Sequence, residues 1–157
     1  MKFNKLLFAT DFSAASQTAF EYASALARVA GATMLIVHVE EFPVSYATGE
    51  MLVIHPDCPN PELRQMLEKV VPVGGVPYEH CLVMGVPADE IVRLAEEHRA
   101  DLIVVGTHGR RGLSRLLTGS VAEIVLRRAQ CPVLAVKAAG RIAQASEEHL
   151  SRTSVSH

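Results

Sequence analysis

Five short apolar runs separated by helical patterns are the feature that most constrains how this chain can fold. Most of the runs are continuously apolar rather than alternating, which is typical of strands that are covered on both faces. Because strands and helical segments alternate along the chain, the pattern predicts an α/β fold, a single doubly wound parallel sheet with helices on both faces. The five predicted strands are Lys5–Ala9, Thr33–Val39, Tyr78–Val83, Leu102–Val105 and Val133–Lys137.

Four helices are predicted over residues 13–30, 61–70, 87–99 and 120–128. The first follows Ser13, a favoured N-cap residue, and ends at Gly31, a favoured residue after a helix. The third starts at Pro87, which suits the first helical position, and the second has the weakest pattern. Residues expected to face the core at helical spacing are Ala15, Ala19, Tyr22, Ala23, Leu26, Ala30, Ile91, Leu94 and Ala95.

The length and composition of the chain indicate one domain. A chain of 157 residues, of which 49% are hydrophobic, can bury a substantial core. We place the domain at residues 1–137, because residues 138–157 form a polar C-terminal tail with little to bury. Residues 40–60 contain several prolines and are expected to form an irregular loop or lid.

Charge and cysteine usage restrict the partners and the compartment. The net charge of −2 and the pI near 6.4 argue against a surface that coats nucleic acid. The apolar runs are far too short to cross a bilayer, and the N-terminus does not have the pattern of a signal peptide. The three cysteines, Cys58, Cys81 and Cys131, form no C-x-x-C pair and fit a reducing compartment. We therefore expect a cytoplasmic protein that binds neither nucleic acid nor membrane.

A glycine-rich segment after the fourth strand carries the clearest indication of a binding site. It contains Gly106, Gly109 and Gly119, and Ser120 opens the last predicted helix. Glycine lets the backbone approach an anion, and the N–H groups at a helix start point toward it. Arg110 adds positive charge. The spacing favours a phosphate site, although glycines in such a segment can also serve simply to form tight turns.

The motif G-x2-G-x9-G-S, followed by V-A-E-I-V-L-R and C-P-V-L, resembles the signature of the universal stress protein family. The opening K-L-L-F-A-T-D-F-S and the run L-I-V-H-V resemble its first two strands, so the resemblance covers nearly all of residues 2–137. It implies a five-stranded sheet of order 3-2-1-4-5 in the adenine nucleotide α-hydrolase-like fold. One branch of the family binds ATP through this motif, and another branch lacks both the motif and ATP binding. The full spacing in this chain resembles the ATP-binding branch.

The resemblance also implies how the chain contacts a nucleotide and a second copy of itself. ATP would be the ligand, with an accompanying Mg²⁺ held largely by phosphates and water. The family often has proline where this chain has Ala9, a departure that loosens the turn without removing the site. The edge strand Val133–Lys137 would pair with its mate to form a homodimer. The matching nucleotide positions are Ala9, Thr10, Asp11, Val39, Gly106, His108, Gly109, Arg110, Gly119, Ser120 and Val121.

Several of these residues have a structural interpretation beside the functional one. Asp11 either hydrogen-bonds the ribose or supports the start of the first helix through its charge. Ala9 and Val39 either form an apolar wall for adenine or are plain core residues. His108 either contacts phosphate or faces solvent, and His38 is expected to pack at the end of the second strand.

Three activities remain open for such a site. It belongs to a nucleotide-gated sensor read by unknown protein partners, to a slow ATPase or self-phosphorylating enzyme, or to a binder of AMP or a cyclic nucleotide. Hydrolysis usually needs a positioned water and a metal held by carboxylates. The sequence offers no obvious base beyond Asp11, so we favour binding over turnover and assign no catalytic residue.

Other phosphate-binding folds and a metal site fit less well. A P-loop needs G-x4-G-K-[ST], and a Rossmann dehydrogenase needs G-x-G-x-x-G after the first strand. A phosphoacceptor receiver domain needs paired acids there, where this chain has Asp11 alone. The close His/Cys groups, His55 with Cys58 and His80 with Cys81, do not supply the four ligands of a structural zinc site.

Overall fold

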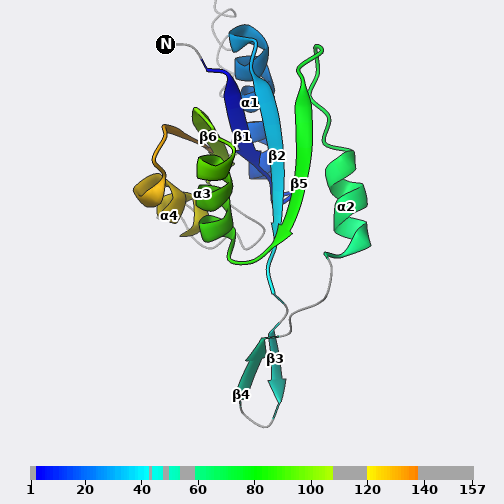
Figure 1. Ribbon diagram of the computed structural model, residues 1–157. Helices are drawn as coiled ribbons and strands as arrows, with labels where there is room; N and C mark the ends of the chain where they lie inside the picture. Colours follow the sequence, from blue (N-terminus) through cyan, green and yellow to red (C-terminus); the bar gives the residue numbers. More distant parts are fainter. Residues whose placement is uncertain (1–2, 43, 48–49, 54–58, 108–119, 138–157) are drawn as a thin grey trace, which may run out of the picture.

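The computed structural model describes residues 3–42, 44–47, 50–53, 59–107 and 120–137. Five strands form one parallel sheet in the order β5-β2-β1-β6-β7, so that β1 lies in the centre (Figure 1). Counted without the separate β3-β4 pair, this is the predicted order 3-2-1-4-5, which is therefore confirmed. The strands are β1 (Lys5–Ala9), β2 (Thr33–Glu40), β5 (Tyr78–Met84), β6 (Leu102–Gly106) and β7 (Val133–Val136).

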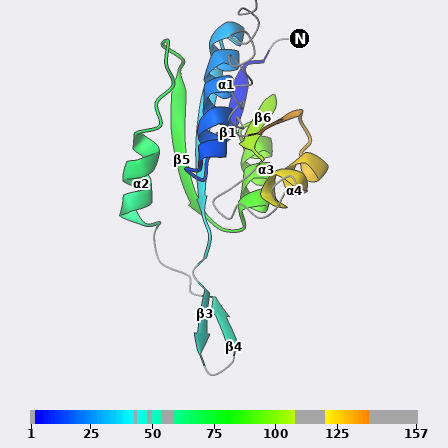
Figure 2. The same cartoon turned by 180° about the vertical axis from the view of Figure 1, so that it is seen from behind.

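Helices cover both faces of the sheet, as the continuously apolar strands predict. Two of them pack on one face and two on the other, which Figures 1 and 2 show from opposite sides. The first face carries α1 (Ala14–Ala30) and α2 (Pro61–Glu68), and the second carries α3 (Pro87–Glu97) and α4 (Ser120–Arg128).

Successive residues of each central strand point to opposite faces and so enter two separate cores. In β1, Leu7 faces α3 and α4, while Leu6 and Phe8 face α1 and α2. The core on the second face, hereafter the α3/α4 cluster, contains Leu7, Leu35, Val37, Val39, Ala88, Ile91, Val92, Leu94, Ala95, Ala100, Ile103, Val105, Ala122 and Val125. The predicted inward positions Ile91, Leu94 and Ala95 of α3 are confirmed as members of it.

Helix α1 has the predicted caps but not all of the predicted buried face. Ser13 Oγ accepts a hydrogen bond from Ser16 N at 3.2 Å, and Gly31 adopts the left-handed conformation at φ 65°. The prediction for Tyr22 was wrong, because its side chain is 56% exposed. A stripe of alanines at every fourth position packs on the sheet instead, and Tyr22 lies about 100° around the helix from Ala23 in that stripe.

Residues 40–60 are not irregular throughout, contrary to the prediction. They contain an antiparallel hairpin of β3 (Val44–Ala47) and β4 (Glu50–Val53), with Val44 opposite Val53. The hairpin extends beyond the carboxyl ends of the sheet strands (Figures 1 and 2). Strands of four residues are too short for periodicity to separate them from loop, although Thr48-Gly49 between two such runs is a usable turn signal.

No helix within the described ranges is long and apolar enough to cross a membrane.

The amino end of the sheet is held by Asp101, which immediately precedes β6. Its Oδ2 accepts hydrogen bonds from Asn4 N at 2.7 Å and Lys5 N at 3.0 Å, and its own N–H donates to Lys5 O at 2.8 Å. The two backbone donors lower the pKa of the Asp101 carboxyl from its ordinary value of 3.8.

We expect Asp101→Asn to destabilise the protein by about 1 kcal/mol at neutral pH. The hydrogen bonds from Asn4 N and Lys5 N would then have a neutral amide oxygen as acceptor in place of a charged carboxylate. A carboxyl whose pKa is lowered by folding stabilises the native state above its unfolded pKa and loses that contribution as pH falls through the folded one. The stability difference between the native protein and Asp101→Asn should therefore shrink as the pH is lowered below about 4.

Urea unfolding at neutral pH and at several acidic values tests this expectation. Glu68→Gln, which removes an exposed carboxylate from α2, is the control for a general loss of negative charge. A difference between the native protein and Asp101→Asn that stays constant down to pH 3 would contradict the role of the Asp101 charge.

Candidate functional site

The predicted site residues from β1 and β6 lie side by side at the carboxyl edge of the sheet. Ala9 in β1 is opposite Val105 in β6, and Gly106 is the last residue of β6. Thr10 extends the pairing on the other side, because its N–H donates to Val37 O in β2 at 2.9 Å. The sheet thus brings Ala9, Thr10 and Gly106 together.

A chain of hydrogen bonds fixes the turn from β1 into α1. Thr10 is buried, and its Oγ1 accepts from Phe12 N at 3.0 Å. Ser16 Oγ donates to Ser13 O at 2.9 Å, which uses its single hydrogen. The Thr10 hydroxyl must then donate to Ser16 Oγ, 3.1 Å away. Thr10 therefore holds the first turn of α1 against the end of β1.

Asp11 also contributes to this turn. Its Oδ1 accepts a hydrogen bond from Ser13 N at 3.0 Å, an arrangement typical of aspartate at the start of a turn. Through this contact, one oxygen of the Asp11 carboxylate has the structural role of supporting the start of α1. The side chain is nevertheless partly exposed, so a ligand can still reach it.

His38, in β2, completes the same network and was not among the predicted site residues. It is buried, as its expected packing at the end of β2 implies, and its Nδ1 lies 2.7 Å from Thr10 O. Since a carbonyl oxygen only accepts, Nδ1 must carry the hydrogen. The His38 ring also contacts the Phe12 ring, with centroids 4.4 Å apart, where Phe12 adopts an unusual φ of 61°. Sequence spacing gives no signal for this contact.

Gly106 has a packing role that the motif did not reveal. A Cβ atom at this position would lie 2.8 Å from the carbonyl carbon of Ala15 and 2.9 Å from Ser16 N. Both atoms belong to the backbone of α1, so they cannot move aside cheaply. The absence of a side chain at Gly106 therefore lets the end of β6 approach the first turn of α1.

Three of the predicted residues take part in the apolar packing on the α3/α4 side of the sheet. Val39 is buried in the α3/α4 cluster, and the partly buried Ala9 and Val121 pack against the same cluster. They come from β1, β2 and the first turn of α4, far apart in sequence. The predicted wall for adenine consisted of Ala9 and Val39, and the burial of Val39 with the partial burial of Ala9 also fits plain core packing.

The remaining site predictions fall on the segment that joins β6 to α4. His108, Gly109, Arg110 and Gly119 lie outside the described residues. The predicted helix start at Ser120 is confirmed as the first residue of α4. Just before the segment, Thr107 is buried and its N–H donates to Val136 O at 2.9 Å, which fixes where the segment leaves the sheet.

Metal-binding side chains do not gather in the described part of the chain. There, no group of three or more His, Cys, Asp or Glu residues is placed to hold a metal ion, and His55 and Cys58 lie outside it. His80 Nε2 donates to Val70 O at 2.9 Å, which gives that ring a structural role. Burial raises the pKa of the Cys81 thiol, so the thiolate form that binds metals is disfavoured at neutral pH.

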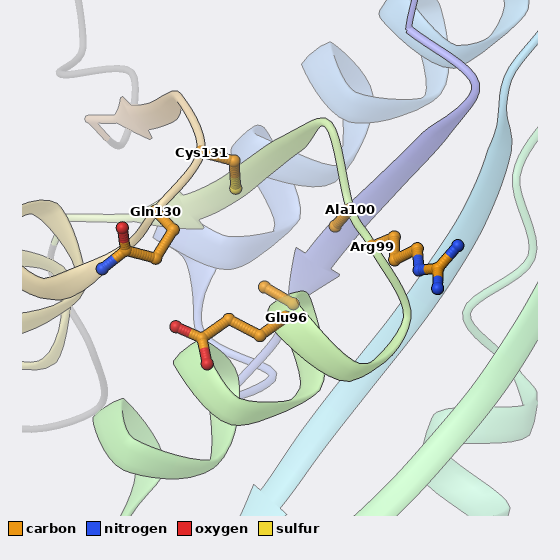
Figure 3. Close-up of a pocket in the computed structure, with 6 residues that line it drawn as sticks. Glu96, Arg99, Ala100, Gln130 and Cys131 are labelled. Atoms are coloured by element: carbon orange, nitrogen blue, oxygen red, sulfur yellow. The ribbon is translucent and has the colours of Figure 1, made fainter.

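A pocket of about 200 Å³ lies at the opposite, amino edge of the sheet (Figure 3). Its lining includes Glu96 from the end of α3, Arg99 from the turn after α3, and Cys131 from the segment before β7. Burial raises the pKa of the Cys131 thiol, so the group is protonated and a weak nucleophile at neutral pH. This pocket is separate from the predicted nucleotide positions.

Comparison with known proteins relates the whole described domain to one family. The family model described as the universal stress protein family matches residues 2–137. Universal stress protein MJ0531 of Methanocaldococcus jannaschii is 39% identical over 141 residues, which cover 86% of this chain and 82% of that protein.

Two similar solved structures contain nucleotides, according to their descriptions. One is a universal stress protein in complex with cAMP, 27% identical, with a TM-score of 0.65 and coverage of 88% of this chain and 99% of the other. The second is the universal stress protein from Archaeoglobus fulgidus in complex with dAMP, 25% identical, with a TM-score of 0.61 and coverage of 87% and 100%.

We expect Gly106→Ala to lower the free energy of unfolding by about 1–3 kcal/mol, because the new methyl group overlaps the α1 backbone. Gly31→Ala is the matched control: its Cβ meets no atom within 4 Å, and it should cost about 1 kcal/mol for the left-handed backbone alone. Asparagine, which tolerates that backbone, should recover stability at position 31 but not at 106. Chemical denaturation of the four variants measures this, and an unchanged stability in Gly106→Ala would disprove the close contact.

Proposed function

Because this chain belongs to the universal stress protein family, we propose that it is an ATP-binding, dimeric regulator of a stress response in the cytoplasm. In this proposal, bound ATP favours one state of the dimer, and partner proteins recognise that state. Such a role needs a nucleotide site and an interface between two copies, which are argued in turn below.

The observation that carries the nucleotide proposal is that Ala9 ends β1 beside Val105 and Gly106 of β6, while Ala9, Val39 and Val121 all belong to or pack against the α3/α4 cluster. In a doubly wound sheet this edge is where ligands bind. The three side chains offer an apolar surface for adenine. Thr10 and Asp11 follow Ala9 directly in the turn after β1, and in this proposal the sugar lies beside that turn.

The phosphates would lie toward the glycine motif that begins at Gly106 and ends at the start of α4. The first N–H groups of α4, including those of Ser120 and Val121, have no partner within a regular helix and favour an anion. Gly109, Gly119, His108 and Arg110 supply close backbone approach and positive charge in the same proposal.

Mg²⁺ would be held mainly by the phosphates and water. Efficient hydrolysis would need a carboxylate placed to orient water or metal. Asp11, the acid beside the proposed sugar position, already accepts the Ser13 N–H. We therefore infer binding with at most slow hydrolysis or self-phosphorylation. Release of less than one phosphate per protein over hours from γ-labelled ATP would agree, and rapid turnover would overturn this inference.

A nucleoside monophosphate is the second ligand to consider. The two relatives described with cAMP and dAMP favour it specifically, since both ligands carry adenine and a single phosphate. Mass spectrometry of the nucleotide released from the purified, denatured protein distinguishes the alternatives directly. Titration calorimetry with ATP, AMP and cAMP then ranks their affinities. If AMP or cAMP binds more tightly than ATP, that nucleotide and not ATP is the ligand of this site.

We expect Gly109→Val to abolish ATP binding in calorimetry while the protein stays folded, because the valine side chain obstructs the approach of phosphate to the backbone. Gly140→Val, the same substitution in the C-terminal tail, is the control and should bind ATP normally. Circular dichroism confirms that both variants are folded. Unchanged affinity in a folded Gly109→Val protein would refute the assignment of the phosphate site to this motif.

The proposed dimer interface is the outer edge of β7. Ile103 N donates to Pro132 O, and Thr107 N donates to Val136 O, so alternate residues of β7 hydrogen-bond to β6. The backbone groups of Val133 and Ala135 therefore point to the outer edge. No described strand pairs with that edge, and a second copy can add its own β7 there.

This register provides a sharp test of the dimer. Ala135→Pro removes an outward N–H and leaves the hydrogen bonds to β6 in place, so we expect a folded monomer by light scattering at micromolar concentration. Leu134→Pro is the contrasting variant, since it removes a hydrogen bond to β6 and should destabilise the fold itself. A native protein that is monomeric, or an Ala135→Pro variant that stays dimeric, would contradict pairing through β7.

A further inference from the structure

The sheet has a second outer edge, on the side opposite β7. β5 is the last strand there, as Figures 1 and 2 show, and no other described strand pairs with its outer side. β5 is seven residues long, whereas β7 has four. Proteins usually protect an edge strand by keeping it short, bending it or charging it, because its unpaired backbone groups can accept another strand. A strand as long as β5 is therefore a place where a further strand can be added.

Hydrogen bonds to β2 show which backbone groups of β5 point outward. Met34 N donates to Pro77 O at 2.8 Å, and Gly85 N donates to Glu40 O at 2.9 Å. In a parallel pair both backbone groups of one residue point to the same side, and successive residues alternate, so the odd-numbered residues of β5 face β2. The N–H and C=O groups of the even-numbered residues point away from the sheet. These residues are Tyr78, His80, Leu82 and Met84.

The outward groups of β5 are complementary to those of an antiparallel copy of the same strand. A two-fold axis at Cys81 places Tyr78 opposite Met84 of the second copy and His80 opposite Leu82. Both are pairs of outward residues, so the full overlap of seven residues gives about eight hydrogen bonds. Cys81 would lie opposite its own copy in a pair without hydrogen bonds, where the Cα atoms are about 4.5 Å apart.

The side chains along β5 suit this arrangement. Glu79 is the acidic residue of the strand, and it would lie opposite Val83 rather than opposite a second carboxylate. Exposed apolar residues lie at both ends, Tyr78 at the start of the strand and Val86 just beyond its end. In an antiparallel pair, Tyr78 of each copy is at the same end as Val86 of the other. Pairing would therefore bring together apolar surface that is exposed in the single chain.

The helices leave room for a second copy at this edge. α2 packs on the first face over both β2 and β5. With strands about 4.8 Å apart, a helix axis midway over these two strands would lie about 10 Å from its copy across the two-fold axis. Packed helices are commonly about 8–10 Å apart, so the two copies of α2 would meet without overlap. On the second face, α3 packs mainly over β2 and lies farther from the axis.

Charge near the proposed axis limits the strength of the pairing. Burial raises the pKa of the Cys81 thiol, and the charges of Arg93, Glu97 and Glu90 on α3 also act on it, which places them near the middle of β5. Together with Glu79, they give each copy three carboxylates and one guanidinium in this region. Two copies therefore repel each other here, and salt screens the repulsion. Pairing through β5 should be weak at low salt and become tighter as salt is added.

We propose that β5 is a second self-association edge, at which two copies of this chain pair antiparallel about Cys81. A dimer formed through β7 would carry one β5 edge at each of its outer ends, so this pairing would join dimers into larger assemblies. It adds to the dimer proposed above and does not depend on it. Because of the repulsion, it operates at protein concentrations well above micromolar.

Disulfide formation at Cys81 tests the register. The variant Cys58→Ser/Cys131→Ser keeps Cys81 as its single thiol, and Cys58→Ser/Cys81→Ser keeps Cys131 as the matched control. Diamide joins two thiols as a disulfide and takes up their two hydrogens as it is reduced to a hydrazine. At several hundred micromolar protein and about 0.5 M salt, we expect the Cys81 variant to form covalent dimer about tenfold faster than the control, measured by non-reducing electrophoresis.

Loss of an outward N–H separates backbone pairing from side-chain effects. In the variant that keeps only Cys81, His80→Ala and His80→Pro both lose the hydrogen bond to Val70 O, and proline also removes an N–H at the edge. The alanine variant should form the disulfide at about the parent rate, and the proline variant about tenfold more slowly. Circular dichroism checks that both are folded. Tyr78→Pro and Tyr78→Ala provide a second pair at the end of the strand, where the fold is less sensitive.

Equal rates for the Cys81 and Cys131 variants, or equal rates for folded proline and alanine variants, would overturn the proposal. Sedimentation of Ala135→Pro gives a further measurement with the β7 edge blocked. This variant should be monomeric at micromolar concentration and form dimers at several hundred micromolar in about 0.5 M salt. A monomer under all of these conditions would also contradict pairing through β5. Since the Cys81 disulfide reports on β5 alone, failure of the β7 dimer would not alter its outcome.

Discussion

The pairing of β1 between β2 and β6 is the interaction on which the rest of this structure depends. Leu6, Leu7 and Phe8 are almost completely inaccessible to solvent, and each contributes about 2 kcal/mol or more through burial. Because these residues point alternately to the two faces, both faces must be covered by helices. The same parallel pairing aligns the carboxyl ends of the strands, which places the turn after β1 beside the end of β6.

That turn is built mainly for stability, and the proposed nucleotide site lies next to it. Thr10, Asp11 and His38 have hydrogen bonds that organise the start of α1. A rigid turn of this kind also presents its exposed groups in fixed positions, which favours ligand binding. Gly106 illustrates the same overlap, since its lack of a side chain is required by the α1 backbone whether or not phosphate binds nearby.

Much of the fold was predictable because its signals are local. Continuous apolar runs indicated the five sheet strands, and Ser13 and Gly31 indicated the ends of α1. Tyr22 was misplaced because it lies near the edge of the helical stripe, where hydrophobicity alone does not decide burial. The β3-β4 hairpin was missed because its strands are too short for a clear period.

The sequence by itself determined the order and type of the sheet elements, the family and the positions to examine for a nucleotide. These follow from periodicity and motif spacing, which are properties of neighbouring residues. Only the tertiary structure decided that Gly106 is packed against Ala15, that His38 donates to Thr10, and that the buried Ser24 Oγ has no hydrogen-bond partner among the described residues. The first two contacts join residues on different elements, and the third depends on what surrounds a helix face, so local sequence patterns carry no signal for them.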